Sequence, residues 1–198
     1  KIMSYIRLSR STKIKTDPKI CLEVMYDFTH FLYKHKSSFT DFKVIKEDID
    51  EQIFYYETKI FNFFPFSLIS PIRRFISIKK LIPEQKMFKQ IYIDIKSKKI
   101  VYLKCEMENT GNNITINNDT VIEISKFMYL FRKPLLWIIN KKMDIMWNED
   151  KEMLQQLFIK KDYQNIHCVP QSFNLNNFLD NKFDQQFKKN KIHSRISI

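Results

Sequence analysis

Residues 135–161 read LLWIINKKMDIMWNEDKEMLQQLFIKK, and they form the longest helical pattern in the chain. Pro134 stands directly before them, where proline favours the start of a helix. Placing the residues at about 100° intervals around a helix axis produces one narrow apolar stripe. The members of the stripe are Met143, Met146, Met153, Leu154 and Leu157. The pattern predicts a long C-terminal helix that packs one face against the rest of the fold.

The residues before this helix consist mainly of strand-like runs. After a strand over 4–14, Asp17 and Pro18 provide an N-cap and a first-turn proline, which predicts a helix from residue 17 into the low 30s. Further strands are predicted over 41–48, 51–61, 86–97, 98–109 and 114–131. A block of strands with helices segregated to one side indicates an α+β fold. A curved antiparallel sheet wrapped around the long C-terminal helix would enclose a cavity, which is a common site for an apolar ligand.

The length of 198 residues suits one domain with a core of its own. We expect that domain to span residues 1–161. Residues 162–198 are rich in Asn, Gln and Lys and show no clear period, so we expect a polar C-terminal tail with room for one short packed segment. His167 and His193 lie in this tail and are given no role.

The net charge of +12 would ordinarily indicate nucleic acid or an anionic membrane surface as a partner. However, the chain has no alanine and one glycine, whereas Lys, Asn, Ile and Phe are abundant. That bias matches AT-rich codons, and the basic residues are spread along the chain rather than gathered in one stripe. We therefore expect no nucleic-acid binding.

Three isolated cysteines, Cys21, Cys105 and Cys168, argue against a disulfide scaffold. They fit a reducing intracellular compartment, most simply the cytoplasm. No signal-peptide pattern and no run of about eighteen apolar residues is visible, so we expect no transmembrane segment.

Asp150 falls inside the apolar stripe of the long helix. A lone carboxylate on a buried face costs several kcal/mol unless it is paired or binds a cation. In one interpretation Asp150 caps a helix or pairs with an arginine such as Arg73 or Arg74. In the other, Asp150 meets His30 and His35 across the fold.

Residues 25–35, MYDFTHFLYKH, hold these two histidines in the spacing Asp27-x-x-His30-x-x-x-x-His35. Two neutral imidazoles and one carboxylate form the facial triad of non-haem Fe(II) oxygenases, which leaves coordination positions open. Imidazole suits iron and zinc alike, so the residues alone do not choose the metal. Positions five apart on a regular helix differ by about 140°. The helix must therefore end or bulge between the histidines for both to face one metal.

The order of elements over residues 4–160 resembles the START-like (SRPBCC) superfamily, which has the helix-grip fold and includes Bet v 1 and polyketide cyclases. This resemblance implies a hydrophobic small molecule as ligand. It leaves open a non-enzymatic carrier of a lipid or isoprenoid, in which the histidines are merely polar points inside the pocket. A third interpretation is a protein-interaction domain with a filled core.

The motif of residues 27–35, with the E-D-x-x-x-x-x-Q pattern of residues 149–156, resembles the catalytic domain of Rieske-type oxygenases, in the branch of pheophorbide a oxygenase. This resemblance implies a mononuclear Fe(II) site that oxidises a large apolar or aromatic substrate with dioxygen. The implied ligands are His30, His35 and Asp150. The resemblance also implies that Asp27 links the iron to the reductant cluster of a neighbouring subunit, and therefore implies a homo-oligomer.

A Rieske cluster needs Cys-x-His and Cys-x-x-His pairs. None of the cysteines stands in such a pair, and His167 and Cys168 are adjacent. This chain therefore holds no Rieske cluster, and electrons would have to come from a separate protein.

The phenylalanine-rich segment 61–69 is expected to form core or pocket wall. Its alternative use is a lid or a peripheral membrane contact, because Arg73-Arg74 and Lys79-Lys80 follow it and could meet anionic lipid. Trp137 and Trp147 are expected to be packing residues.

Overall fold

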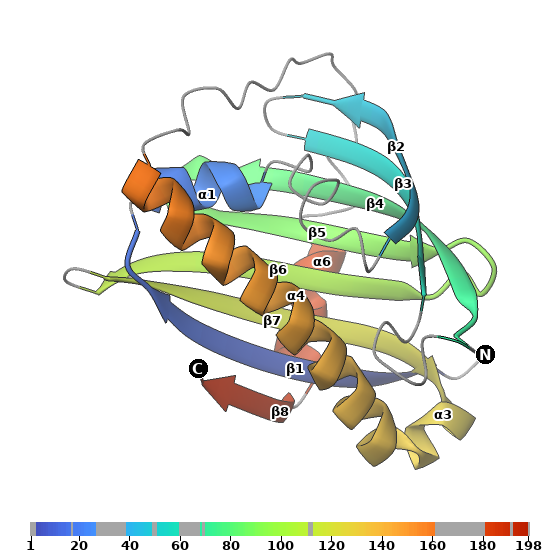
Figure 1. The fold of residues 1–198 in the computed structure, drawn as a ribbon. Helices are drawn as coiled ribbons and strands as arrows, with labels where there is room; N and C mark the ends of the chain where they lie inside the picture. The colour runs from blue at the N-terminus through green and yellow to red at the C-terminus, as the bar shows by residue number, and fades with distance from the viewer. Residues whose placement is uncertain are drawn as a thin grey trace.

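The computed structural model is built around one curved sheet of eight strands (Figure 1). It describes residues 3–16, 18–26, 39–48, 51–59, 68, 70–110, 113–160, 181–190 and 192–197. The strands are β1 (Met3–Ile14), β2 (Phe39–Glu47), β3 (Glu51–Lys59), β4 (Ile72–Ile82), β5 (Met87–Asp94), β6 (Ile100–Thr110), β7 (Asn113–Ser125) and β8 (Ile192–Ser197). The helices are α1 (Pro18–Tyr26), α3 (Lys126–Leu130), α4 (Arg132–Lys160) and α6 (Asn181–Lys189), with a short 3₁₀ helix η2 (Pro83–Gln85).

The strands lie in the order β2-β3-β4-β5-β6-β7-β1-β8. The first strand, β1, returns beside β7, with Met3 opposite Ser125 and Ile14 opposite Ile114. The strand pairs from β2 to β1 are antiparallel, and β8 is parallel to β1. The predicted α+β architecture, a curved antiparallel sheet around a long C-terminal helix, is confirmed.

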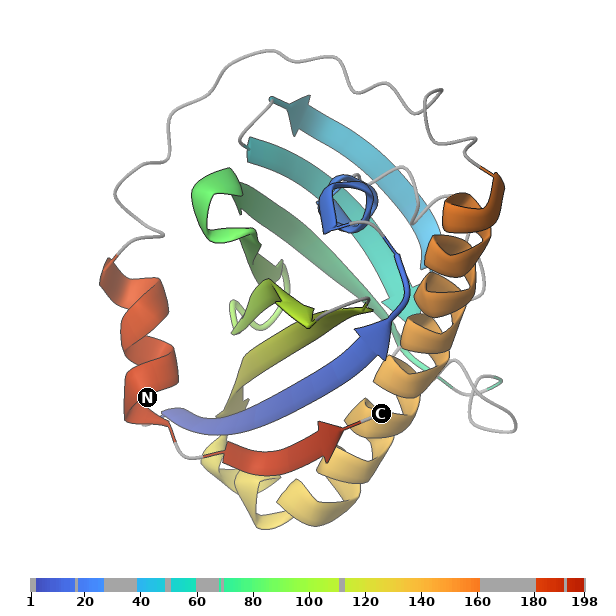
Figure 2. The same ribbon diagram turned by 90° about the vertical axis from the view of Figure 1, so that its left-hand side faces the viewer.

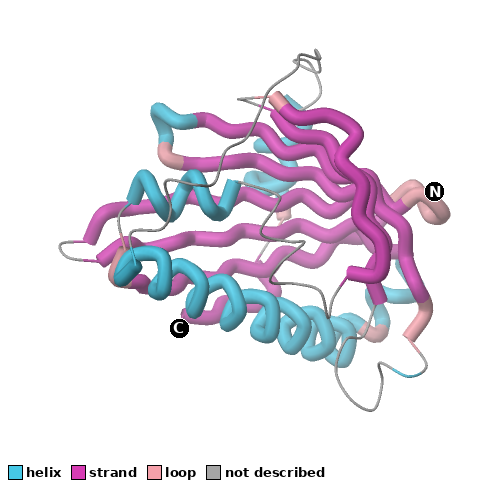
Figure 3. Tube along the Cα trace, turned by 45° about the horizontal axis from the view of Figure 1, so that its top comes forward, coloured by secondary structure: helices cyan, strands magenta, loops and turns pink. Residues whose placement is uncertain are grey.

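The two faces of the sheet are covered by different helices. The helices α1 and α4 cover one face, which we call the inner face, and α6 covers the opposite, outer face (Figures 2 and 3). Successive side chains of a strand point to opposite faces. Along β4, Phe75 and Lys79 point to the inner face, whereas Ile76 and Ile78 pack against the outer face.

The long helix is confirmed, with α4 beginning at Arg132, a few residues before the predicted start. The predicted strand over 114–131 ends at Ser125, because the Oγ of Ser125 accepts a hydrogen bond from the N–H of Met128 at 3.2 Å and caps α3. Trp147 is buried as predicted, but Trp137 is mostly exposed, so its expected packing role is wrong. No helix among the described residues is long and apolar enough to cross a membrane.

The strand β4 was missed from the sequence. Four basic residues interrupt its apolar pattern, and the prolines before it suggest a loop. In the sheet, β4 pairs along its length with β3 and with β5, so it is a central strand. The turn into β5 follows η2 and places Lys86 in the left-handed region, with φ of 47°.

The C-terminal residues contribute a helix and a strand to the body, where a largely polar tail was expected. Phe183 and Phe187, one turn apart on α6, are buried against the apolar side chains of the outer face. On β8, the Nδ1 atom of His193 accepts a hydrogen bond from the N–H of Arg7 at 3.1 Å. The helix α6 and the strand β8 therefore pack on the sheet.

Candidate functional site

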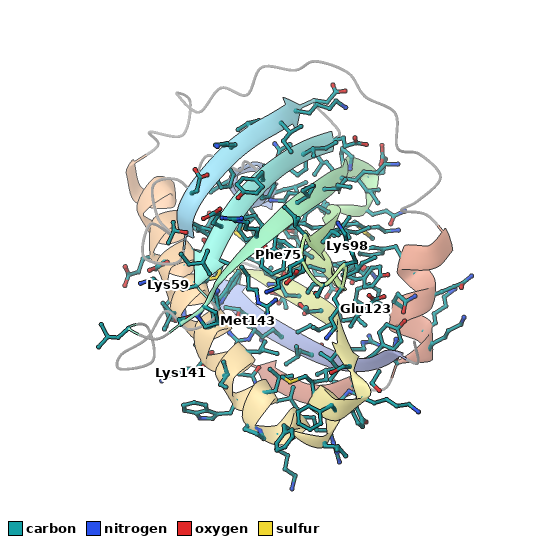
Figure 4. The ribbon with its side chains drawn as sticks, turned by 90° about the vertical axis from the view of Figure 1, so that its right-hand side faces the viewer. Lys59, Phe75, Lys98, Glu123, Lys141 and Met143 are labelled. Atoms are coloured by element: carbon teal, nitrogen blue, oxygen red, sulfur yellow. The ribbon has the colours of Figure 1, made fainter. Side chains whose placement is uncertain are left out.

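The inner face of the sheet, beneath α1 and α4, is the candidate site. Strand alternation aims a continuous set of side chains at these helices: Gln52, Phe54, Tyr56, Phe75, Ser77, Lys79, Phe88, Gln90, Tyr92, Cys105 and Met107. Cys21, Met25 and Tyr26 of α1, and Trp147 and Leu154 of α4, close over part of this set. Of the predicted apolar stripe of α4, Met146 and Leu154 pack against the side chains of the sheet, and Figure 4 shows Met143 on that side of the helix.

One half of the inner face is an aromatic wall. The rings of Tyr56 and Phe75 are stacked, with centroids 5.3 Å apart, and Tyr92 meets Tyr56 edge-on at 6.0 Å. Phe54 continues the wall, and Met146 of α4 packs on it. Burial raises the pKa of the Tyr56 and Tyr92 phenols well above the ordinary value, so both remain neutral hydroxyls.

A row of polar side chains crosses the sheet beside this wall. Gln52 of β3 lies opposite Lys79 of β4, and Lys79 lies opposite Gln90 of β5. Each of the three is 1% exposed. Gln90 donates from Nε2 to the Oγ of Ser77 at 2.7 Å. Buried polar side chains need hydrogen-bond partners. This row on three adjacent strands is therefore the part of the otherwise apolar inner face that can bind polar atoms.

Lys79 lies at the centre of the row, and its side chain caps the C-terminal end of α1. Its Nζ donates to the carbonyl oxygens of Met25 at 2.5 Å and Tyr26 at 3.0 Å. The ring of Phe88 lies 4.4 Å from the same ammonium group. A cation at a helix C-terminus satisfies free carbonyls and complements the helix dipole. Lys79 therefore holds α1 on the sheet. Because Lys79 is buried, it is not a basic residue that could meet lipid in the alternative membrane contact of segment 61–69.

Asp150 is buried on α4, as its place in the apolar stripe predicted, with 6% exposure. Burial, and to a smaller extent the negative charge of Asp150, raises the pKa of Cys21 to about 12. Burial first, and then the same carboxylate, raises the pKa of Tyr92. Burial also raises the pKa of Cys105, and the neighbouring Cys21 and Asp150 add to this increase. Asp150 thus lies among neutral thiols and a neutral phenol, and neither cysteine is a reactive thiolate.

The two arginines considered as partners of Asp150 pair with other carboxylates. Arg73 lies 3.4 Å from Asp94, and Arg74 lies 2.7 Å from Glu57.

The other predicted site residues, Asp27, His30 and His35, lie outside the described residues. Of the predicted iron ligands, the structure therefore places Asp150 alone. Within the described ranges, no group of three His, Cys, Asp or Glu side chains is arranged to hold a metal ion. The iron site stays a prediction.

Several buried polar atoms on the inner side have no hydrogen-bond partner among the described residues. They include the Oε1 of Gln52, the Nε1 of Trp147 and the Oγ1 of Thr120. An unpaired buried donor or acceptor costs about 1–3 kcal/mol, so such atoms call for a bound molecule or water. The Oε1 of Gln52 on β3 can therefore accept a hydrogen bond from a bound molecule, and the Nε1 of Trp147 on α4 can donate one.

The sequence contained a weak signal for the polar row. Gln52 precedes Ile53, and Gln90 precedes Ile91, so each glutamine stands at an alternating position in a β-rich run. Neighbouring aromatic residues on both faces of β3 hide the alternation. Only the strand pairing shows that the three residues are adjacent.

No protein-family model and no curated protein matches the sequence. Several solved structures do match the fold of this chain. The chain has the helix-grip fold. An aromatase/cyclase from Streptomyces matches at 9% identity and a TM-score of 0.60, over 81% of this chain and 99% of the other. A START superfamily protein from Mycobacterium smegmatis matches at 8% identity and a TM-score of 0.54, over 76% and 98%.

Norcoclaurine synthase from Thalictrum flavum has the same helix-grip fold, at 12% identity and a TM-score of 0.57, over 76% of this chain and 87% of the other. These structure neighbours are START-like proteins, which agrees with the resemblance read from the element order. The match to the aromatase/cyclase leaves about a fifth of this chain without a counterpart.

Proposed function

We propose that this chain binds a largely apolar small molecule of the lipid or isoprenoid type on the inner face of its helix-grip sheet. The single observation that carries the proposal is the buried row of Gln52, Lys79 and Gln90 in an otherwise apolar wall, with the Oε1 of Gln52 unpartnered among the described residues. Such a ligand would place its apolar part on the aromatic wall and one polar atom at this row.

The chemistry of the inner face supports binding better than catalysis by a cysteine. Cys21 and Cys105 are buried neutral thiols, and the phenols of Tyr56 and Tyr92 are neutral. Neutral hydroxyl, amide and indole groups can orient a hydroxyl or carbonyl group of a ligand without reacting with it. The structure neighbours include a START superfamily protein, which supports the same reading.

The test uses parinaric acid, a fluorescent polyene fatty acid that accepts energy from tryptophan. Trp147 lies in the inner-face core and Trp137 on the surface. Because energy transfer falls steeply with distance, we expect Trp147→Phe to reduce it more strongly than Trp137→Phe does. Equal loss in both variants, or no transfer in the unmodified chain, would contradict binding beneath α4.

A matched pair of substitutions tests the polar row. We expect Gln52→Leu to weaken binding of the probe about tenfold, because one hydrogen bond to the ligand is worth about 1–1.5 kcal/mol. The control is Tyr55→Phe, the neighbour of Phe54 on the opposite face of β3, where the hydroxyl donates to Glu57 at 2.5 Å. Equal affinities for the two variants would remove the polar row from the site.

We also propose a second candidate function, a mononuclear Fe(II) site on His30, His35 and Asp150. The observation that favours it is the burial of the Asp150 carboxylate on the inner side of α4. When bound, Fe(II) would supply oxygen chemistry next to an apolar substrate, with electrons from a separate protein. Asp150 would then act as a metal ligand, with Cys21 and Tyr92 excluding bulk water around it.

Anaerobic Fe(II) titration with nitric oxide as a spectroscopic probe tests this second candidate. A stoichiometric high-spin iron–nitrosyl signal that disappears in Asp150→Ala supports the iron site. The control is Asp144→Ala, six residues earlier on α4, whose carboxylate pairs with Arg10. Absence of a signal in the unmodified chain would exclude the site and leave the binding function untouched.

A further inference from the structure

Large apolar side chains are exposed where α3 meets the start of α4. We call this surface the α3–α4 corner. Its members are Phe127, Leu130, Phe131 and Trp137. Leu130 is 74% exposed, Phe127 67% and Trp137 57%. Clusters of this kind on a protein surface mark interaction sites, because isolated exposed apolar residues are common and grouped ones are not.

The fold fixes the exposure of these side chains. Ser125 caps α3 directly at the end of β7, so the short helix leaves the sheet at a defined angle. Tyr129 turns toward the body, where its hydroxyl lies 3.3 Å from the Nε2 of His193. With Tyr129 inward, Phe127 and Phe131 lie together on the outside, with ring centroids 5.2 Å apart. In Figure 1, α3 projects from the end of the sheet.

Basic residues surround the corner and acidic residues are absent from its sequence. Residues 126–142 contain five basic residues and no Asp or Glu: Lys126, Arg132, Lys133, Lys141 and Lys142. Lys133, Trp137 and Lys141 follow one another at intervals of four, so they share one side of α4. All three are exposed, and Figure 4 shows Lys141 on the side of α4 turned away from the sheet.

We propose that the α3–α4 corner docks on the surface of an anionic lipid bilayer. Aromatic and aliphatic side chains of a projecting corner enter the headgroup region, where tryptophan is favoured. Lys126, Lys133 and Lys141 then meet the phosphate and carboxylate groups of acidic lipids, each contributing about fivefold to partitioning. Residues 126–142 carry the charge that complements such a surface, and this stretch contains no carboxylate. The proposal is independent of ligand binding on the inner face.

Tryptophan fluorescence provides the test, because the chain has two tryptophans and Trp147 is buried. In a Trp147→Phe background, Trp137 reports on the corner alone. The probes are vesicles of phosphatidylcholine, and vesicles of phosphatidylcholine and phosphatidylserine in equal parts, with brominated lipid as quencher. We expect a blue shift and quenching of Trp137 with the acidic vesicles. Co-sedimentation of the unmodified chain with the same vesicles checks the result if the background variant folds poorly.

Two pairs of variants locate the contact. The double variant Lys126→Gln/Lys133→Gln should weaken binding to acidic vesicles by at least about tenfold. Lys43→Gln and Ile45→Ser, on exposed positions of β2, should leave it unchanged.

Three results would overturn the proposal. The first is an unchanged Trp137 spectrum with acidic vesicles. The second is vesicle binding that the β2 variants weaken as much as the lysine variants of the corner. The third is a dimer, detected by light scattering, in which Trp137 is already shielded without lipid, because the corner would then be an interface between two copies of this chain.

Discussion

Replacing Lys142 by methionine should change how the stability of the protein depends on pH. The Nζ of Lys142 on α4 donates to the Oγ1 of Thr58 at 2.9 Å and to the carbonyl oxygen of Lys59 at 2.7 Å. These bonds tie the middle of α4 to the end of β3. Burial between the helix and the strand lowers the pKa of Lys142 from 10.5 to about 8.

The sign of the effect follows from proton binding. Below about pH 8 both states carry the proton, so the folded state bears the full cost of the buried charge. Between about pH 8 and the ordinary lysine pKa, the unfolded chain keeps its proton and the folded protein loses it. The free energy of unfolding therefore rises with pH across this window. One unit of pKa corresponds to about 1.4 kcal/mol, so the gain from about pH 7 to about pH 10 is about 2–3 kcal/mol.

Urea unfolding, followed by circular dichroism at several pH values, measures this gain as a difference between proteins. The free energy of unfolding of the unmodified chain minus that of Lys142→Met should rise by about 2–3 kcal/mol over the window. Groups shared by both proteins, such as the buried thiols and phenols, cancel in this difference. Lys141→Met is the matched control, because Lys141 is the exposed neighbour on the same helix, and its difference should stay flat. Parallel curves for the unmodified chain and Lys142→Met would refute the reasoning.

Two further predictions test the packing of the two faces. Phe183→Ala should lower the free energy of unfolding by about 3–5 kcal/mol, because it empties a fully buried ring site on α6. Lys188→Ala on the exposed side of the same helix should change it by less than about 0.5 kcal/mol, and equal small effects would show that α6 is not docked. In a Cys168→Ser background, Cys21 and Cys105 should not react with Ellman's reagent at about pH 8 until the chain is unfolded in urea, because the reagent needs a thiolate. Fast reaction of the native protein would contradict their burial.

The elements with a long regular period could be predicted from the sequence. The 29 residues of α4 carry one apolar stripe, and that stripe also predicted the burial of Asp150, because a helical period assigns every residue to a face. Most of the antiparallel strands were predicted because β-rich runs and turn residues alternate clearly over 86–125. From these elements the helix-grip architecture follows.

The strand β4 could not be predicted because some of its charged residues lie at the surface and others are buried. Arg74 pairs with Glu57, while Lys79 is buried under α1. From the local sequence, Arg74 and Lys79 both look like surface residues, so the apolar alternation that would predict a strand is broken. The burial of Lys79 depends on the carbonyl groups of Met25 and Tyr26, which a distant segment supplies.

The helix α6 and strand β8 were not predicted because their signals are short. The helix has two inward phenylalanines, Phe183 and Phe187, among seven largely polar residues, which fits a solvated tail equally well. The docking of α6 depends on the apolar outer face of the sheet, and the strand pairing of β8 depends on the edge of β1. Both are tertiary effects that composition cannot show.

Native mass spectrometry of the freshly purified chain tests the central claim, ligand binding on the inner face, most directly. We predict a population heavier than the polypeptide by one small hydrophobic molecule, which organic extraction releases for identification. We predict that this population is reduced in Gln52→Leu and unchanged in Tyr55→Phe, on the outer face of the same strand. A single species at the mass of the bare chain, unchanged after incubation with parinaric acid, would contradict the claim and favour an interaction domain with a filled core.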